Sequence, residues 1–309
     1  MEYEGQICRA PMERSSFMLP VMVGCSYNKC KFCNLFRHLK YRELPIKQIE
    51  NELIRVKKLG GALKKVFLGD GSAFDLPTEH LLNVLKLINF YFPQINEINM
   101  DATVSGILKK NETELETLYK NGVRHLYIGI ESGLDDVLIF MKKDHNMEEA
   151  QKAVERIKQI GYFFNAHIMT GVCGKNKGKE NVIALSEFFN KWQPSRIINF
   201  SMFLHSEVPL YQDIIKGKYE PKDELSNLKE EAYLIEKLKP KSNIHYEGFH
   251  DFIKIRVQGH LPKDKDKMLL FLNSKIAIYE KRQPIYAFVN GECTASTLIN
   301  NDGKKVWGS

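Results

Sequence analysis

Short apolar segments alternate with amphipathic segments over the first two thirds of this 309-residue chain. Apolar segments with Gly, Asp or Ser at their ends are typical of buried parallel strands. They lie at residues 17–23, 65–68, 97–103, 125–130, 162–169 and 196–203. Helices with one apolar face are expected at residues 46–59, 78–90, 112–121, 147–159 and 180–192, with Thr78 capping the second. Repeated strand–helix units require a parallel sheet, so six strands predict an α/β fold with a partial (β/α)6 parallel barrel.

The pattern changes after residue 215, where the sequence becomes rich in charged residues. The expected elements are a helix ending the segment 216–241, an extended segment at 244–259, a helix at 263–281, and short antiparallel strands within 285–307 with turns at Asn290-Gly291 and Asp302-Gly303. We therefore divide the chain into a core barrel, residues 1–215, and a small C-terminal α+β cap, residues 216–309. The cap is expected to close the substrate side of the barrel, with its extended segment among the substrate contacts.

Composition and charge exclude several classes of protein. Hydrophobic residues make up 43% and charged residues 27% of the chain, which excludes a disordered chain, a collagen-like fibre and a coiled-coil rod. The net charge of +7 is compatible with an anionic substrate or a nucleic acid. No apolar run reaches the roughly 18 residues of a transmembrane helix, and the first ten residues lack the apolar core of a signal peptide. A cytoplasmic protein with no membrane partner is expected.

Three of the six cysteines lie within nine residues, directly after the first predicted strand: Cys25, Cys30 and Cys33. Thiolates are the usual ligands of iron–sulfur clusters, and three of them can hold a [4Fe–4S] cluster with one iron left open. The alternative is a structural zinc site with His38 as the fourth ligand, in a non-enzymatic binding protein. Zinc sites usually present two paired ligand sets, whereas one pair here has a two-residue gap, which favours iron–sulfur. The remaining cysteines are not expected to be ligands: Cys8, Cys173 and Cys293.

This loop resembles the cysteine loop of the radical SAM superfamily, which follows the first barrel strand. Phe32 stands where that family commonly has an aromatic residue before its last cysteine. The usual family spacing is Cys-x3-Cys-x2-Cys, whereas four residues separate Cys25 from Cys30 here. The resemblance covers residues 15–215, and GCSYNKCKFCN, FLGDGSAF and YIGIESG are most similar to the branch of the elongator catalytic subunit and the oxygen-independent coproporphyrinogen oxidases. It implies two cofactors, a [4Fe–4S] cluster and S-adenosyl-L-methionine (SAM).

The resemblance also implies a SAM site at the ends of the second and fourth strands. Gly69, Asp70 and Gly71 stand where the family has a glycine-rich segment facing the SAM amino group. Glycines permit close backbone approach, and a carboxylate can pair with an ammonium, although a plain turn is the alternative. Glu131 and Ser132 stand where polar residues meet the SAM ribose and carboxylate. Capping of the next helix is the alternative role for this pair.

The fifth strand resembles the adenine-contacting segment of the family more loosely. The position of Gly171 matches, Met169 belongs to the same segment, and His167 occupies a position where a glycine is common. Phe200, on the sixth strand, is either an adenine contact or a core residue. Further candidate substrate contacts, each more often an ordinary structural residue, are Cys173, His205, His245 and His250.

The resemblance implies a radical SAM enzyme, an oxidoreductase or a transferase. A reductant such as flavodoxin or ferredoxin would supply the electron for SAM cleavage, and the resulting radical would abstract hydrogen from a small-molecule substrate. A nucleic-acid substrate is the alternative, favoured slightly by the net charge and by Lys175, Lys177 and Lys179, although such a loop is more often a solvated turn. The sequence does not identify the substrate.

Overall fold

The computed structural model describes residue 4, residues 8–289 and residues 295–296. The chain divides into two compact units. The first unit comprises Met1–Asn28, Leu35–Gly129 and Glu148–Asn165, and the second comprises Lys29–Asn34, Ile130–Met147 and Ala166–Ser309. Each unit is therefore built from segments that are distant in sequence.

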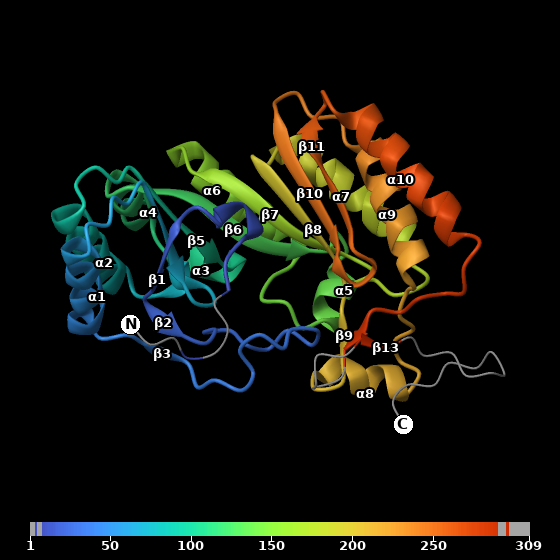
Figure 1. Ribbon diagram of the computed structural model, residues 1–309, viewed down its shortest axis with the longest axis horizontal. Coiled ribbons are helices and arrows are strands. Elements are labelled where there is room, and N and C mark those ends of the chain that lie inside the picture. Colours follow the sequence, from blue (N-terminus) through green and yellow to red (C-terminus); the bar gives the residue numbers. More distant parts are fainter. Residues whose placement is uncertain (1–3, 5–7, 290–294, 297–309) are drawn as a thin grey trace. The chain divides into compact units, whose positions relative to one another are not determined.

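Parallel strands form the sheet of the first unit (Figure 1). These strands are β1 (Phe17–Pro20), β4 (Lys65–Gly69), β5 (Glu97–Ala102) and β6 (Val123–Glu131), and each pairs in parallel with the next. The register places Leu19 opposite Leu68, and Leu68 opposite Met100. All three side chains are fully buried, and burial of each stabilises the fold by about 1.5–3 kcal/mol.

The first predicted strand is in fact two strands. β1 ends at Pro20, and β2 (Met22–Val23) pairs antiparallel with β3 (Arg42–Glu43). Proline has no N–H to donate to a strand ladder, and the next residue, Val21, donates its N–H to the Gly69 carbonyl. The cysteine loop therefore follows β2 and begins at Gly24, which has a left-handed φ of 77°.

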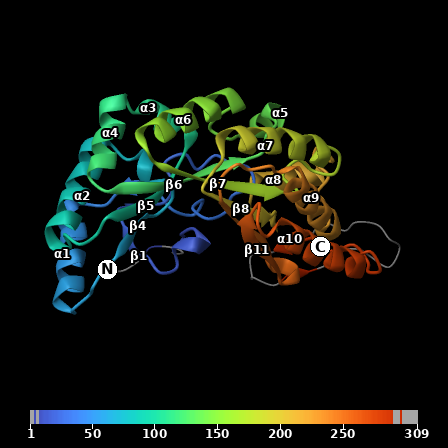
Figure 2. The same ribbon diagram turned by 90° about the horizontal axis from the view of Figure 1, so that it is seen from above.

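Four helices of the first unit match the sequence expectations closely. They are α1 (Ile46–Lys58), α2 (Thr78–Tyr91), α4 (Glu112–Lys120) and α6 (Met147–Ile160), and α1 and α2 lie side by side (Figures 1 and 2). A capping box of Asn111 and Glu114 begins α4. The expected cap of α2 is wrong, because Thr78 is its first helical residue and the N-cap position belongs to Pro77. The remaining helical segments were not anticipated: η1 (Pro11–Glu13), η2 (Ala73–Asp75) and α3 (Val104–Lys109).

The second unit contains the later strands: β7 (Phe163–Thr170), whose first residues belong to the first unit, β8 (Arg196–Ser201), β10 (Ile244–His250) and β11 (Ile255–Leu261). β10 pairs in parallel with β8 and antiparallel with β11. The sheet order is β1-β4-β5-β6-β7-β8-β10-β11, so the six predicted strands follow one another as expected. The extended segment predicted at residues 244–259 is thus a hairpin, with η3 (Asp251–Ile253) at its turn, that continues the main sheet. The boundary at residues 215–216 stays a prediction.

Helices and a small sheet complete the second unit. The helices are α5 (Asp135–Phe140), α7 (Gly178–Trp192), α8 (Pro209–Ile215), α9 (Glu224–Lys237) and α10 (Lys265–Tyr279), and α9 and α10 lie beside each other along the β10–β11 hairpin (Figure 1). The small sheet has the order β13 (Ala295–Ser296), β12 (Phe288–Val289), β9 (Leu204–His205). The turns expected at Asn290-Gly291 and Asp302-Gly303 lie outside the described residues. None of the helices in the described part of the chain has the length and apolar character needed to span a bilayer.

Candidate active site

The cysteine loop connects β2 and β3. In the first unit, Asn28 reverses the loop in a left-handed conformation, with φ 43°, and its N–H donates to the Cys25 Sγ at 3.5 Å. The Asn28 side chain donates to the Phe36 carbonyl at 3.0 Å, which fixes the reversal. Hydrogen bonds to the cysteine sulfurs are one of the means by which a protein tunes an iron–sulfur cluster. The Cys25 sulfur therefore already has one donor of the kind that supports metal ligation.

Cys30 and Cys33 belong to the second unit, and the Cys33 N–H donates to the Cys30 carbonyl at 3.3 Å. Burial raises the pKa of the Cys30 thiol to about 11, and the ammonium of Lys143 opposes this rise. A buried thiol becomes a thiolate readily when a metal cation binds it, so these residues suit iron. The described residues do not bring three His, Cys, Asp or Glu side chains into a preformed metal site, and Cys293 lies outside them. The three-cysteine ligand set therefore stays a prediction.

The Gly69-Asp70-Gly71 turn ends β4 and lies in the first unit. The Asp70 side chain is buried, and its Oδ1 has no hydrogen-bond partner among the described residues. Burial raises the pKa of this carboxyl to about 6, although a hydrogen bond from the Cys8 backbone lowers it. A buried carboxylate oxygen without a partner is costly, and an ammonium group would satisfy it. This unpartnered oxygen would suit the amino group that the family resemblance implies at this turn, and that contact stays a prediction.

Gly71 has a left-handed φ of 45°, and a Cβ at this position would lie 2.4 Å from the Gly24 carbonyl oxygen. Glycine is thus required here both by conformation and by space. The consequence is that the turn packs against the start of the cysteine loop. Both segments lie in the first unit, so the predicted SAM segment and the first predicted iron ligand are in contact there.

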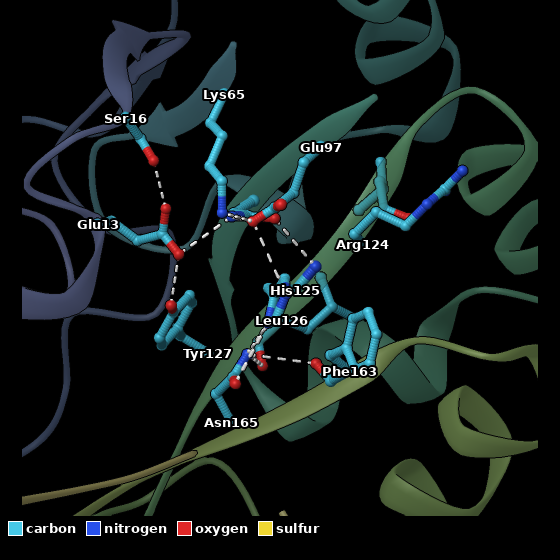
Figure 3. Close-up of polar contacts among 12 residues, drawn as sticks. Glu13, Ser16, Lys65, Glu97, Arg124, His125, Leu126, Tyr127, Phe163 and Asn165 are labelled. Atoms are coloured by element: carbon cyan, nitrogen blue, oxygen red, sulfur yellow. Dashed lines mark hydrogen bonds and ion pairs between the residues drawn. The ribbon is translucent and has the colours of Figure 1, made fainter. Parts of the chain in front are cut away.

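A polar network in the first unit was missed by the sequence analysis (Figure 3). Glu13 is buried and accepts hydrogen bonds from the Tyr127 hydroxyl at 2.5 Å and the Asn99 amide at 3.0 Å. Burial raises the pKa of Asp101 to about 8, with further contributions from Glu13 and Asp70. The alternation Glu97-x-Asn99-x-Asp101 along β5 was the available signal, since alternate residues share one face of a strand. Burial and the two neighbouring carboxyl groups thus favour the uncharged form of the Asp101 carboxyl.

The end of β6 lies in the second unit. Glu131 has a left-handed φ of 60° and forms an ion pair with the buried Lys143, with 3.4 Å between Oε1 and Nζ. The Ser132 hydroxyl donates to the Asn181 side-chain oxygen at 2.8 Å and accepts from the Leu134 N–H at 3.2 Å. The hydroxyl of Ser132 thus supports the turn into α5, and its expected contact with the SAM carboxylate stays a prediction. The Glu131 side chain pairs with the Lys143 ammonium rather than with the backbone of this turn.

The end of β7 carries the residues assigned to adenine. Gly171 has a φ of 86°, and a Cβ there would lie 2.7 Å from the Asn227 side-chain oxygen. Met169 and Phe32 are partly buried and pack against an apolar cluster of the second unit. His167 stacks on Phe200 with 5.9 Å between ring centroids, and burial, assisted by Lys143, lowers the pKa of His167 to about 4. An uncharged, stacked imidazole offers a flat surface suited to a base, whereas Met169 offers an apolar contact.

The remaining sequence candidates have structural partners. Burial raises the pKa of Cys173 to about 12, so its thiol stays protonated. The His205 Nδ1 lies 3.0 Å from the amide nitrogen of Asn34, next to Cys33 in the loop. His245 stacks on His260, with 4.8 Å between centroids. The two ring nitrogens of the fully buried His250 each lie 2.9 Å from a carboxylate, of Glu224 and Glu231. The interpretation of His250 as a substrate contact is therefore replaced by a buried ionic role.

The chain is similar to proteins of one superfamily. The sequence profile described as the Radical SAM superfamily matches residues 19–185, more than half of the chain. The heme chaperone HemW of Buchnera aphidicola subsp. Schizaphis graminum is 23% identical over 291 residues, a match that covers 85% of this chain and 73% of the relative. The tRNA uridine(34) acetyltransferase of Methanocaldococcus jannaschii is 23% identical over 111 residues, which cover 36% of this chain and 20% of the relative.

Solved structures support the same fold. Elp3 of Methanocaldococcus infernus superposes with a TM-score of 0.55 at 15% identity, covering 86% of this chain and 64% of that one. Methylornithine synthase (PylB) superposes with a TM-score of 0.53 at 16% identity, covering 94% of this chain and 77% of that one. The chain thus spans less than two thirds of the Elp3 structure, and at these identities the likeness concerns the fold alone.

Proposed function

This chain belongs to the radical SAM superfamily, whose enzymes use a [4Fe–4S] cluster and SAM, and from that premise we propose that it cleaves SAM reductively and abstracts hydrogen from a small-molecule substrate. This proposal rests on three reduced cysteines in one loop and on a glycine turn that contacts the backbone of that loop. The cluster and SAM supply the one-electron chemistry when bound, and the protein supplies binding, orientation and electrostatics. A reductant of the flavodoxin or ferredoxin type would provide the electron.

Each candidate residue has a definite task in this proposal. Cys25, Cys30 and Cys33 hold three irons, which leaves one iron open for the amino and carboxyl groups of SAM. Asp70 offers its unpartnered Oδ1 to the SAM ammonium, since a charge-assisted hydrogen bond would replace the lost solvation of this oxygen. Glu131 accepts hydrogen bonds from the ribose hydroxyls, because its carboxylate can receive two donors at once.

The alternative interpretation, a structural zinc site in a non-enzymatic binding protein, is less well supported than an iron–sulfur cluster. The superfamily profile covers the cysteine loop, and His38, the fourth ligand that zinc would require, is exposed to solvent. Zinc in structural sites almost always has four protein ligands. The three cysteines therefore support a cluster with an open iron better than they support zinc.

A nucleic-acid substrate is the second candidate function. Several relatives are named as tRNA-modifying enzymes, which favours it. The lysine loop that suggested nucleic acid gives weaker support, because Lys175 pairs with Glu220 at 2.8 Å and Lys177 pairs with Asp136. Lysines paired in this way contribute less charge toward a phosphate backbone. The HemW relative spans more of this chain, so a porphyrin of the haem type is one small molecule to test.

The decisive experiment is anaerobic purification of the full chain and of single cysteine variants. We expect a brown protein with about four irons per chain that cleaves SAM when it is reduced. Cys25→Ala, Cys30→Ala and Cys33→Ala should each lose the chromophore and SAM cleavage, whereas Cys8→Ala and Cys173→Ala should retain both. A colourless wild-type protein containing zinc would contradict the proposal. Titration of the intact enzyme with haem and with tRNA then separates the two substrate classes.

A further inference from the structure

A fixed turn follows α5 in the second unit. Lys142 has a left-handed φ of 53°, its N–H donates to the Ile139 carbonyl at 3.0 Å, and the Lys143 N–H donates to the Leu138 carbonyl at 2.9 Å. This pair of bonds is the Schellman arrangement that ends many helices. The backbone of Lys143 is thereby held in one conformation, and its side chain is directed into the protein, with only 8% of its surface exposed.

The same turn is bonded to the cysteine loop. The Lys31 N–H donates to the Met141 carbonyl at 2.9 Å, and the Lys31 carbonyl accepts from the Leu210 N–H at 3.1 Å. The Lys31 ammonium also pairs with Asp213 at 2.7 Å, so the loop is attached to both α5 and α8. Because Lys31 directly follows Cys30, these bonds fix Cys30 relative to the turn that carries Lys143.

The Lys143 ammonium lies among anionic and potentially anionic groups. Its Nζ is 3.4 Å from Glu131 and 3.9 Å from Asp144, and the same Asp144 oxygen lies 3.0 Å from the His145 ring nitrogen. The carboxylate partners of this ammonium thus hold a buried positive charge beside the turn that is bonded to the cysteine loop.

We propose that Lys143 is an electrostatic positioning residue of the iron–sulfur site, which acts through Cys30 to make the cluster easier to reduce. This inference rests on the proposed function. Each electron that enters a cluster adds negative charge, and a buried cation nearby stabilises the reduced form because the protein interior screens charge weakly. The Glu131 carboxylate, on the other side of the ion pair, opposes this effect. Lys143 and Glu131 should thus move the midpoint potential in opposite directions.

The test is a redox titration of the anaerobically reconstituted full chain without SAM, followed by electron paramagnetic resonance. Lys143→Gln should shift the midpoint potential to more negative values by about 59 mV or more, which is a tenfold change in a one-electron equilibrium. Lys143→Arg keeps the positive charge and should therefore have the wild-type midpoint potential. Lys142→Gln removes the same charge from an exposed neighbour and should leave the potential unchanged.

If Lys143→Gln does not retain a cluster, Glu131→Gln takes its place, and its midpoint potential should move to more positive values. The inference is overturned if Lys143→Gln retains its cluster at the wild-type potential, or if the Glu131→Gln potential does not rise. Failure of the proposed function is distinguishable, because the wild-type protein would then hold no cluster at all. If Lys143 had a purely structural role, its variant would hold less cluster, but the midpoint potentials of Lys143→Gln and Glu131→Gln would not shift in opposite directions.

Discussion

The backbone of Cys25 lies against Gly71: a Cβ on this glycine would be 2.8 Å from the Cys25 Cα. A contact this short between a side chain and backbone cannot be relieved by rotation of a side chain, so the cysteine loop itself would have to move. We therefore expect Gly71→Ala to lower the iron content of the anaerobically purified protein several-fold. Iron analysis and the visible absorbance of the cluster measure this directly.

Gly60→Ala is the matched control, because Gly60 also has a left-handed φ, of 74°, but a Cβ there meets nothing within 4 Å. Alanine in a left-handed conformation costs roughly 1–2 kcal/mol wherever it occurs. Both variants should therefore lose stability through backbone strain, Gly71→Ala more than Gly60→Ala because of its added clash, and only Gly71→Ala should lose iron. Equal iron content in the two variants would show that the contact between Gly71 and Cys25 is not needed for the cysteine loop to hold iron.

Asp70→Asn should change stability in a pH-dependent way in the protein without SAM. The pKa of Asp70 is raised to about 6 by burial, above its ordinary value of 3.8. A raised folded-state pKa gives stability that is fully present below pH 3.8 and is lost as pH rises through about 6. The variant should gain roughly 1–3 kcal/mol over wild type between pH 4 and pH 7, measured by urea unfolding. A constant difference across this range would argue against a buried, ionising carboxyl.

Glu131→Ala should weaken SAM binding by roughly 1–3 kcal/mol, the cost of leaving buried polar groups without their partners. Cluster assembly should persist, because the three cysteines are unaltered. Calorimetric titration with SAM measures the effect. Ser132→Ala provides the comparison: its hydroxyl also bonds to Asn181, so that variant should lose stability in addition to the SAM affinity expected from its contact with the carboxylate. Unchanged SAM affinity in Glu131→Ala would remove this residue from the pocket.

Long periodic elements could be predicted from the sequence, and short elements could not. The helix predicted at residues 46–59 is α1 within one residue, because several turns of one apolar face define it. α3 and α5 contain six residues each, too few for a period to show. The division of the first strand at Pro20 depends on pairing between β2 and β3, a long-range contact that local sequence does not specify.

Residues with a distinctive chemical type could be proposed for the site from the sequence, whereas residues placed by tertiary structure could not. Asp70 was expected from the resemblance of the Gly69-Asp70-Gly71 turn to the family's glycine-rich segment, its unpartnered oxygen would suit an ammonium, and its contact with SAM stays a prediction. Lys143 carries no motif of its own, and its importance arises from the left-handed turn at Lys142. The buried ionic role of His250 was not anticipated, because a histidine on a strand does not reveal that two glutamates of α9 face it.

The buried ion cluster of His250 should make stability depend on pH above neutrality. Burial opposes its charge, but Glu224 and Glu231 raise the pKa of His250 to about 9, above the ordinary 6.5. The stabilisation is therefore fully present below pH 6.5 and is lost as pH rises through about 9.

His250→Gln leaves two buried carboxylates without their cation, which should cost roughly 3–5 kcal/mol near neutral pH. Urea unfolding should show this gap at pH 6.5 and its narrowing by pH 9.5, since the wild-type histidine then loses its charge as well. His245→Gln, on the same strand but partly exposed, should cost much less at both values. A His250→Gln penalty of equal size at both pH values would mean that the imidazole acts as a neutral hydrogen-bond donor rather than as a buried cation.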